Sequence, residues 1–262
     1  MMRALTTSGA GMIAQQYNLD TIANNLANVN TTGFKNQRSE FQDLMYQTIK
    51  GSGTLTSGAA AQPTSVQVGL GTRFSGHAIS FSQGALQSTT NPLDLSISGN
   101  GFFQVELPDG RTAYTRDGSF KMDANGLVVT SDGYPLVPNI TIAPGSRAIS
   151  ISETGQVSAI TPDGNEPADL GTIQVAVFPN ESGLLRIGQN LFEGGGASGE
   201  ASAVDPGTAG AGRIQSGFLE GSNVQIVEEM VRMIMAQRAY EINSKGVMTA
   251  DEMLSTLNNL KR

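Results

Sequence analysis

The fold is decided by SNVQIVEEMVRMIMAQRAYEINSKGVMTADEMLSTLNNLKR, residues 222–262. Apolar and small residues recur there at heptad spacing without a proline, so we predict one long amphipathic helix with a coiled-coil seam. Ser222 and Gln225 have the spacing of a capping box, which predicts that the helix begins at Ser222. At 1.5 Å per residue the helix would be ~60 Å long, so it needs partners beyond an ordinary core. Its seam positions are Ile226, Met233, Tyr240, Val247 and Leu254, with Ala236, Asn243, Ala250 and Leu257 three residues further on.

The start of the chain carries the same period. Leu5, Met12, Leu19 and Leu26 recur every seven residues, and Ile22 and Val29 follow the last two at a spacing of three. The residues NTTG at 30–33 then predict a helix stop. Periodicity leaves two readings open, an antiparallel hairpin that closes one domain and a bundle between molecules. Small and polar residues on the seams favour many closely packed helices, namely Ser8, Gly9, Gly11, Gln15, Gln16, Asn243, Ser244 and Gly246.

Composition narrows the class of protein. The chain has 262 residues, enough for one to three domains, and its 32 glycines predict many turns. It has no cysteine, which excludes disulfides and thiolate catalysis. Neither a transmembrane run nor a signal-peptide pattern is present in the sequence, so we expect a protein that is not membrane-embedded and carries no cleaved signal. The net charge of −7 comes from the middle of the chain, which argues against a nucleic-acid partner.

The middle of the chain changes from helical to strand periodicity. Residues 34–49 have mixed apolar spacing, which predicts a short helix or an irregular arm, and 51–63 read as an extended or mobile linker. From Val66 onward apolar residues alternate with other residues, as in a half-buried strand. Turn sequences separate these strands at PDGR 108–111, DANG 123–126, SDGY 131–134, ETGQ 153–156 and PDGN 162–165.

The predicted fold class is therefore α+β, with an all-β domain inserted between two helical ends. We expect a terminal helical domain from residues 1–33 and 222–262, and a connecting arm from 34–65 and 213–221. The β-rich outer domain should cover 66–212, with a flexible glycine-rich and alanine-rich loop at 194–212.

Catalytic and metal-binding patterns have little support in this sequence. His77 is the single histidine and has no second histidine or cysteine to complete a metal pair. The GNG at 99–101 and GLG at 69–71 lack the spacing of a nucleotide-binding loop. Asp117, Asp123 and Asp132 fall in separate turns and do not form a calcium loop. We expect no enzyme, no cofactor and no metal.

Three blocks of sequence resemble the rod and hook proteins of the bacterial flagellum, its axial family. They are LDTIANNLANVNTTGFKNQR at 19–38, LDLSISGNGFFQVELPDGRTAYTRDGSFKMDANGLVVTSDGYPL at 93–136, and SNVQIVEEMVRMIMAQRAYEINSK at 222–245. Within that family, residues 41–75 and the ending KGVMTADEML are most similar to the distal-rod members. The family motif falls on Asn24, Asn25, Asn28, Gly33, Phe34, Ala239, Tyr240, Glu241 and Asn243.

The resemblance implies a structural subunit whose terminal helices pack into tubes with the β-domain outside. The polymer interface would then comprise Leu5, Met12, Leu19, Ile22, Leu26, Val29, Ile226, Met233, Tyr240, Val247, Leu254 and Leu257. Implied partners are further copies of the chain, the proximal rod and hook subunits, the peptidoglycan-layer and outer-membrane rings, and the flagellar type III export apparatus. The segment 51–63 would lie between neighbouring subunits and stiffen the filament.

Two alternative functions remain open at this point. The chain could be another axial protein, such as the other large rod subunit or a hook-like subunit, although residues 41–75 weigh against both. It could also be a secreted polysaccharide-binding β-domain that dimerises through its helical ends. A carbohydrate site usually presents aromatic platforms, and this chain has no tryptophan.

Overall fold

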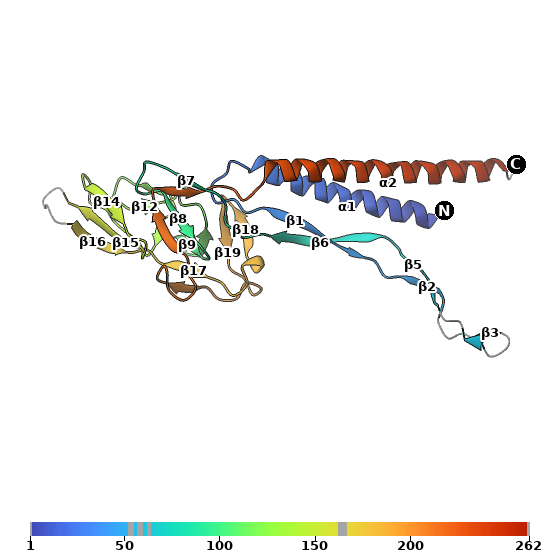
Figure 1. The fold of residues 1–262 in the computed structure, drawn as a ribbon, viewed down its shortest axis with the longest axis horizontal. Coiled ribbons are helices and arrows are strands. Elements are labelled where there is room, and N and C mark those ends of the chain that lie inside the picture. Colours follow the sequence, from blue (N-terminus) through green and yellow to red (C-terminus); the bar gives the residue numbers. More distant parts are fainter. Residues whose placement is uncertain (1, 52–54, 57–59, 62–63, 162–166, 261–262) are drawn as a thin grey trace. The chain divides into compact units, whose positions relative to one another are not determined.

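The computed structural model of the chain describes residues 2–51, 55–56, 60–61, 64–161 and 167–260. They form two compact units (Figure 1). The helical unit contains residues 1–26, 37–78 and 226–262, and the β unit contains 27–36 and 79–225. These boundaries differ from the predicted ones, because residues 66–78 belong with the helices and residues 213–225 belong with the β-strands.

The helical unit contains α1 (Met2–Ala27) and α2 (Ile226–Leu260), which run antiparallel (Figure 1). Small residues lie where the helices meet. A Cβ atom on Gly11 would lie 3.0 Å from Nδ2 of Asn243, and one on Gly246 would lie 3.1 Å from Oγ of Ser8. The hairpin reading is therefore confirmed within one chain, while the bundle between molecules stays a prediction.

The predicted start of the second helix is wrong by four residues. Helix α2 begins at Ile226, and the Ser222 hydroxyl accepts a hydrogen bond of 3.3 Å from the amide of Val224, in a turn before the helix. Glu228 and Glu229 occupy the first turn, where carboxylates interact favourably with the positive end of the helix dipole. These carboxylates favour a start at Ile226.

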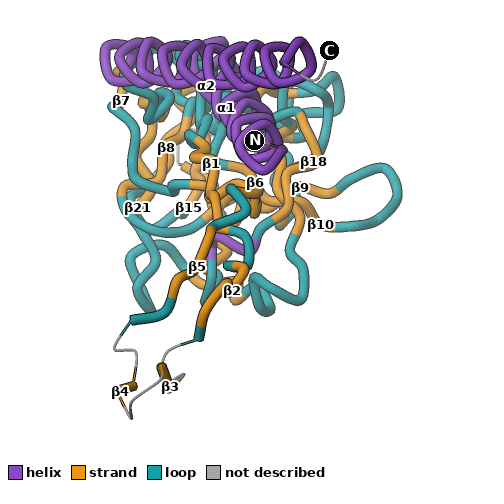
Figure 2. Tube along the Cα trace, turned by 90° about the vertical axis from the view of Figure 1, so that its right-hand side faces the viewer, coloured by secondary structure: helices purple, strands orange, loops and turns teal. Residues whose placement is uncertain are grey.

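A two-stranded ribbon completes the helical unit (Figure 2). Strand β1 (Gln37–Asp43) pairs with β6 (Thr72–Ile79), β2 (Gln47–Lys50) with β5 (Val66–Val68), and β3 (Leu55–Thr56) with β4 (Ala60–Ala61). The short helix considered for residues 34–49 is therefore wrong, and this part of the chain is a strand arm. Most of the predicted linker 51–63 lies outside the described residues.

The β unit is built on a seven-stranded sheet in the order β18-β19-β10-β9-β17-β20, with β13 also paired to β9. Its strands are β9 (Phe102–Glu106), β10 (Thr112–Thr115), β13 (Leu136–Val137), β17 (Val175–Val177), β18 (Leu185–Gly188), β19 (Leu191–Glu193) and β20 (Ser202–Val204). Strand β9 is antiparallel to its neighbours β10, β13 and β17, and a tight turn joins it to β10.

Smaller sheets surround the seven-stranded one. Strands β14 (Arg147–Ile151), β15 (Gln156–Ile160) and β16 (Pro167–Thr172) form a three-stranded sheet, and β11 (Lys121–Met122) pairs with β12 (Val128–Val129). The returning chain pairs β21 (Arg213–Ser216) with β8 (Leu95–Ser98), and β22 (Phe218–Glu220) with β7 (Leu86–Ser88). A short 3₁₀ helix, η1, spans Glu181–Gly183.

The alternating residues of the sequence form the core of the β unit. Leu95, Ile97, Phe103, Val105 and Val175 are all buried in one hydrophobic cluster, so the period-two prediction is confirmed there. A second cluster is largely aromatic. Its buried residues are Phe102, Phe178, Phe192, Ala176 and Leu184. Burial of this apolar surface is the main stabilising contribution to a β domain of this size.

Four of the five predicted turns are present. Gly110, Gly126, Gly133 and Gly155 all have positive φ, and each amide closes a turn onto a carbonyl three residues earlier. The fifth predicted turn, PDGN at 162–165, lies outside the described residues. The prediction of a flexible loop at 194–212 is wrong, because β20 pairs with β17 inside this range and Ser198 and Ala211 are buried.

Candidate assembly surfaces and a buried ion cluster

The predicted helix seam is covered only in part within the single chain. Ala236, Asn243 and Ala250 form one stripe at a spacing of seven, and Asn243 contacts Gly11 of α1. Of the twelve predicted interface residues, Ile22 is buried and three, Ile226, Tyr240 and Leu257, are exposed. The rest are half-buried, namely Leu5, Met12, Leu19, Leu26, Val29, Met233, Val247 and Leu254.

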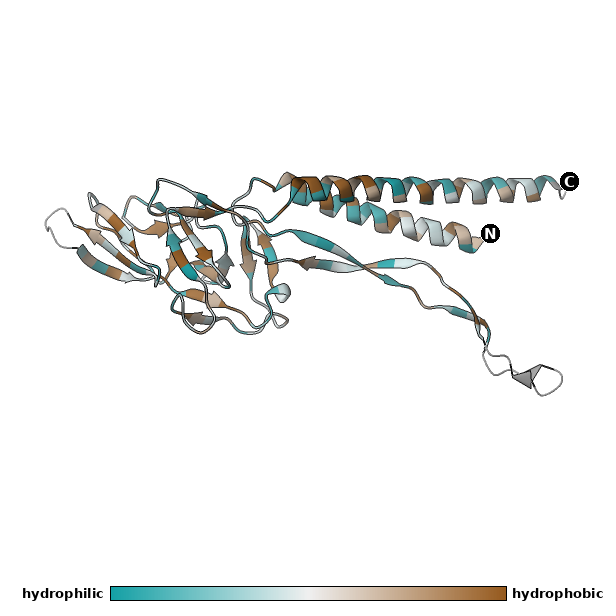
Figure 3. Cartoon of the chain, viewed as in Figure 1, coloured by the Kyte–Doolittle hydropathy of each residue, from teal (hydrophilic) through white to brown (hydrophobic). Residues whose placement is uncertain are grey.

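A second apolar surface on α2 is exposed, and we call it the outer face. Val227, Val231 and Ile234 are spaced by four and three residues, so they lie along one side of the helix. Val227 is 76% exposed and Ile234 57%. Met230, Met235 and Ile242 widen this face, and Figure 3 shows hydrophobic residues concentrated in the first half of α2. An apolar face of this size on a water-soluble helix indicates a surface that becomes covered.

The outer face could have been found from sequence. Residues 226–235, IVEEMVRMIM, place apolar side chains on more than one side of a helix, and a helix that is apolar all round is usually buried on all sides. Val227, Val231 and Ile234 fall between the heptad positions, so the seven-residue spacing does not include them.

Asn25, a family-motif residue, fastens α1 to the strand arm. Its Nδ2 donates to the carbonyl of Gln37 at 2.8 Å, and its Oδ1 accepts from the amide of Gln37 at 2.9 Å. One helical turn earlier the hydroxyl of Thr21 lies 2.7 Å from the hydroxyl of Ser39. Both bonds are made by buried groups of α1, and together they set where β1 starts along the helix.

His77 lies on β6 beside these residues. It is exposed, its Nδ1 is 3.4 Å from the Thr21 hydroxyl, and its ring is 4.8 Å from that of Phe74. The prediction that it is a strand or surface histidine is confirmed. Among the residues that the structure describes, no group of three or more histidine, cysteine, aspartate or glutamate side chains could hold a metal ion.

Gly33 and Phe34 hold the segment after α1 in the β unit. Gly33 has φ of +66°, and a Cβ there would lie 2.5 Å from the amide nitrogen of Asp117, so no side chain fits. Its amide donates to the carbonyl of Glu220 at 2.8 Å. Phe34 is buried under the guanidinium of Arg186, which lies 4.9 Å from the ring centroid.

The remaining motif residues are exposed or half-buried, and the hydrogen bonds of Asn28 and Glu241 join residues close in the sequence. Asn28 accepts from the hydroxyl of Thr31 through its side chain and from the amide of Thr31 through its carbonyl, both at 3.2 Å. Glu241 accepts from Arg238 at 2.8 Å on the helix surface. Asn24 and Tyr240 are exposed, whereas Ala239 and Asn243 are half-buried.

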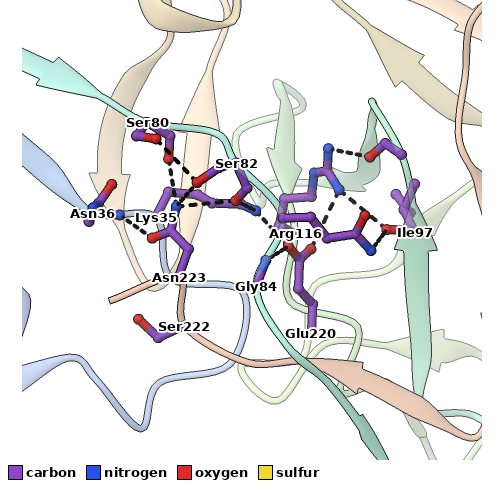
Figure 4. A network of polar contacts seen from close by, with 12 residues as sticks. Lys35, Asn36, Ser80, Ser82, Gly84, Ile97, Arg116, Glu220, Ser222 and Asn223 are labelled. Carbon is purple, nitrogen blue, oxygen red and sulfur yellow. Dashed lines mark hydrogen bonds and ion pairs between the residues drawn. The ribbon is translucent and has the colours of Figure 1, made fainter. Parts of the chain in front are cut away.

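Lys35, Arg116 and Glu220 form a buried ion cluster in the β unit (Figure 4). Nζ of Lys35 lies 2.6 Å from Oε1 of Glu220, and a guanidinium nitrogen of Arg116 lies 3.4 Å from Oε2. The carboxylate also accepts from the amide of Gly84 at 2.9 Å. All three side chains are at most 1% exposed, so the pairs are desolvated. Removing Glu220 would leave two buried cations without a countercharge.

The cluster carries two cations against one carboxylate. Burial lowers the pKa of Lys35, the nearby Arg116 lowers it further, and the attraction of Glu220 acts in the opposite direction. Burial also lowers the pKa of Arg116, while Glu220 again opposes the shift. Arg186 beside the cluster donates to the carbonyl of Lys35, and burial lowers its pKa to about 10.

No pattern in the sequence predicted this ion cluster. Its members are 185 and 104 residues apart along the chain, so no local pattern connects them. The available signal was weak: Glu220 follows the apolar pair Phe218-Leu219, and Lys35 follows Phe34 directly. A charged side chain next to a buried stretch raises the question of its partner without identifying it.

No helix in the described parts of the chain is both long enough and apolar enough to span a membrane.

Three family models match the chain in sequence order. "Flagella basal body rod protein" matches residues 5–35, "Flagellar hook protein FlgE/F/G D1 domain" matches 96–159, and "Flagellar basal body rod FlgEFG protein C-terminal" matches 215–260. The first and third cover most of the two terminal helices, and the second covers the centre of the β unit.

Relatives called "Flagellar basal-body rod protein FlgG" match over the whole length. The protein of Borreliella burgdorferi is 53% identical over 264 residues, with 100% of both chains covered. That of Buchnera aphidicola subsp. Schizaphis graminum is 46% identical, covering 99% of this chain and 100% of the relative. The Bacillus subtilis protein is 43% identical, with 100% of both covered.

Proposed function

Because the chain belongs to the family of flagellar basal-body rod proteins, we propose that it is the distal-rod subunit and polymerises into a rigid tubular drive shaft that transmits torque to the hook. In this role it is a structural protein and not an enzyme. It reaches its place through the flagellar type III export apparatus.

The exposed outer face of α2 is the observation that most strongly supports polymerisation. Hydrophobic side chains there stand in water in the single chain, and burying them contributes roughly 25 cal/mol per Å² of apolar surface. Further copies of the same helical unit offer matching apolar surface. Contacts that repeat from copy to copy without closing a ring generate a helical filament.

The seam residues and the outer face make different contacts in the proposed assembly. We propose that the buried and half-buried seam residues fix the α1–α2 hairpin. The exposed seam residues Ile226, Tyr240 and Leu257 then contact neighbouring copies together with the outer face. Glycines at the helix contact keep the hairpin thin, so that several hairpins can lie close together around a narrow channel.

Other partners follow from the position of a rod. Proximal rod subunits would lie at one end of the polymer and hook subunits at the other, with the peptidoglycan-layer and outer-membrane rings around the β units. The β unit contains most of the acidic residues, and its net negative charge helps to keep the surface soluble.

Imaging basal bodies from a strain that lacks this chain tests the proposal. We expect hook-basal structures that stop within the rod, and we expect the full-length chain supplied in trans to restore complete rods. Intact rods of normal length in the deletion strain would overturn the assignment.

A further inference from the structure

Asn223 lies beside one of the points where the chain passes between its two compact units. There are four such passages, after residues 26, 36, 78 and 225. Residues close to three of these passages, Asn36, Ser80 and Asn223, meet inside the β unit (Figure 4). The three are far apart in the sequence, so only the fold brings them together.

The side chain of Asn223 uses both ends of its amide. Oδ1 accepts from the backbone amide of Asn36 at 2.7 Å, and Nδ2 donates to the carbonyl of Ser80 at 2.9 Å and that of Ser82 at 3.1 Å. The hydroxyl of Ser82 lies 3.0 Å from the same Nδ2. The backbone amide of Asn223 donates to the carbonyl of Phe34 at 3.3 Å.

A further backbone bond closes the set of contacts. The amide of Ser80 donates to the carbonyl of Asn36 at 3.0 Å, so each of the three segments is bonded to the other two. We call these three segments, 34–36, 80–82 and 222–224, the clamp. Most of its bonds are made to backbone atoms and therefore restrain the path of the chain.

The ion cluster ties the same segments a second time. Lys35 donates to the carbonyl of Ser82 at 2.9 Å and pairs with Glu220, three residues before Asn223. The clamp is thus backed by a buried charge pair that resists separation of the strands. Asparagine suits the clamp because it offers one acceptor and two donors on a short side chain, whereas aspartate offers no donor when ionised.

We propose that Asn223 is a positioning residue that holds the three segments together as one unit, so that twist applied to the helical unit passes into the β unit through tied segments. The clamp itself is independent of what the protein does. Its role in carrying torque rests on the proposed function.

Amide hydrogen exchange on the full chain tests the clamp. In Asn223→Ala we expect the amide of Asn36, which loses its acceptor, to exchange at least about fivefold faster. We also expect the amide of Ser80 to exchange faster, although its own acceptor, the carbonyl of Asn36, is untouched. A lost local hydrogen bond would change Asn36 alone, and that result would overturn the clamp.

Asn180→Ala is the matched control. Asn180 lies in the β unit and donates one side-chain bond to the carbonyl of Ala197, away from the clamp. Amides in the centre of β9 should keep their protection in both variants, which shows that the β unit is folded. If Asn223→Ala unfolds the β unit, Asn223→Ser, which keeps a short polar side chain but not both bonds, replaces it in the same measurement.

Swimming under increasing viscous load tests the torque role. We expect Asn223→Ala cells to build complete rods and to lose speed at high load relative to Asn180→Ala and parent cells. Equal speeds at every load would overturn the torque role, as would failure of Asn223→Ala to build rods while parent cells build them. If the parent chain itself restores no rods, the proposed function fails, and the exchange data still decide the clamp.

Discussion

At the residue scale, the junction segment 32–36 is held by contacts from several parts of the β unit. Thr32 donates to Asp117 at 2.9 Å, Gly33 packs on the backbone of residues 116–117, and Lys35 pairs with Glu220. Each contact is with a residue that lies far away in the sequence. The segment therefore acquires its path from the β unit and not from local propensity.

Glu220→Gln should destabilise the β unit strongly. The change leaves Lys35 and Arg116 buried without a countercharge, and breaking a buried pair in this way costs about 3 to 5 kcal/mol. Chemical unfolding of the full chain, followed by circular dichroism, measures the loss. The double variant Lys35→Met with Glu220→Gln should recover part of it, because one buried cation is removed. A loss below about 1 kcal/mol for Glu220→Gln would mean that water reaches the cluster.

The pH dependence of the free energy of unfolding should reveal the lowered pKa of Lys35. The pKa of Lys35 is lower in the folded chain than in the unfolded chain, so at a pH between the two values the unfolded state binds more protons. Stability from this group is therefore fully present above the unfolded pKa of about 10.4 and is lost as the pH falls through the folded pKa. Lys35→Met should lack this rise. Parallel stability curves for parent and variant through that window would contradict the assignment.

At the element scale, α2 has one side that contacts α1 and another side that is apolar and exposed. The seam side packs on α1, and the outer face carries Val227, Val231 and Ile234 in water. The two-stranded ribbon is likewise apolar and exposed at Met45, Tyr46 and Ile49. A ribbon of two strands is at best marginally stable by itself in water, so it too needs cover.

Charges placed on the two sides of α2 should act differently. Ile234→Asp should leave the monomer folded and stop polymerisation, because a carboxylate in a packed interface costs roughly several kcal/mol. Met233→Asp, and Leu19→Asp on α1, should also weaken the helix hairpin, since these residues are half-buried in the single chain. Polymer yield by sedimentation and helix content by circular dichroism separate the two effects. Normal polymer from Ile234→Asp would show that the outer face stays in solvent.

Deleting residues 51–63 should change the mechanics of the filament. We expect the shortened chain to be exported and to polymerise, but into a bendable filament or a rod of altered length, because the segment would no longer lie between neighbouring subunits. Electron microscopy of isolated basal bodies measures both length and curvature. A straight rod of normal length would indicate that the segment is only a tether.

At the scale of the whole molecule, the two units differ in how they are stabilised. The β unit has two hydrophobic clusters of its own. The described residues of the helical unit that are buried and apolar are few, with Ala14, Ile22, Ala236 and Ala250 the buried ones on the helices. We therefore expect the helical unit to gain stability from contacts outside the single chain.

Hydrogen exchange on the free subunit should separate the units. We expect fast exchange in residues 1–50 and 222–262, apart from 27–36 and 222–225, which belong to the β unit, since long helices are marginal in water until they are packed. Exchange should be slow in the strands of the β unit. Assembly should protect the terminal regions. Strong protection at both ends under conditions that prevent polymerisation would defeat this prediction, with the strands β9 and β10 as the internal reference.

The sequence by itself determined the two helices, strands in the core of the β unit, four turns and the family. Heptad spacing predicted both helices, period two predicted strands such as 95–98 and 102–106, and glycine at 110, 126, 133 and 155 predicted turns, because each of these signals is local. Tertiary structure alone decided that 37–43 is a strand and that 194–212 is folded, since their partners β6 and β17 lie elsewhere in the chain. It also decided which side of α2 meets α1 and assembled Lys35, Arg116 and Glu220, because burial and ion pairing depend on distances that residue spacing does not contain.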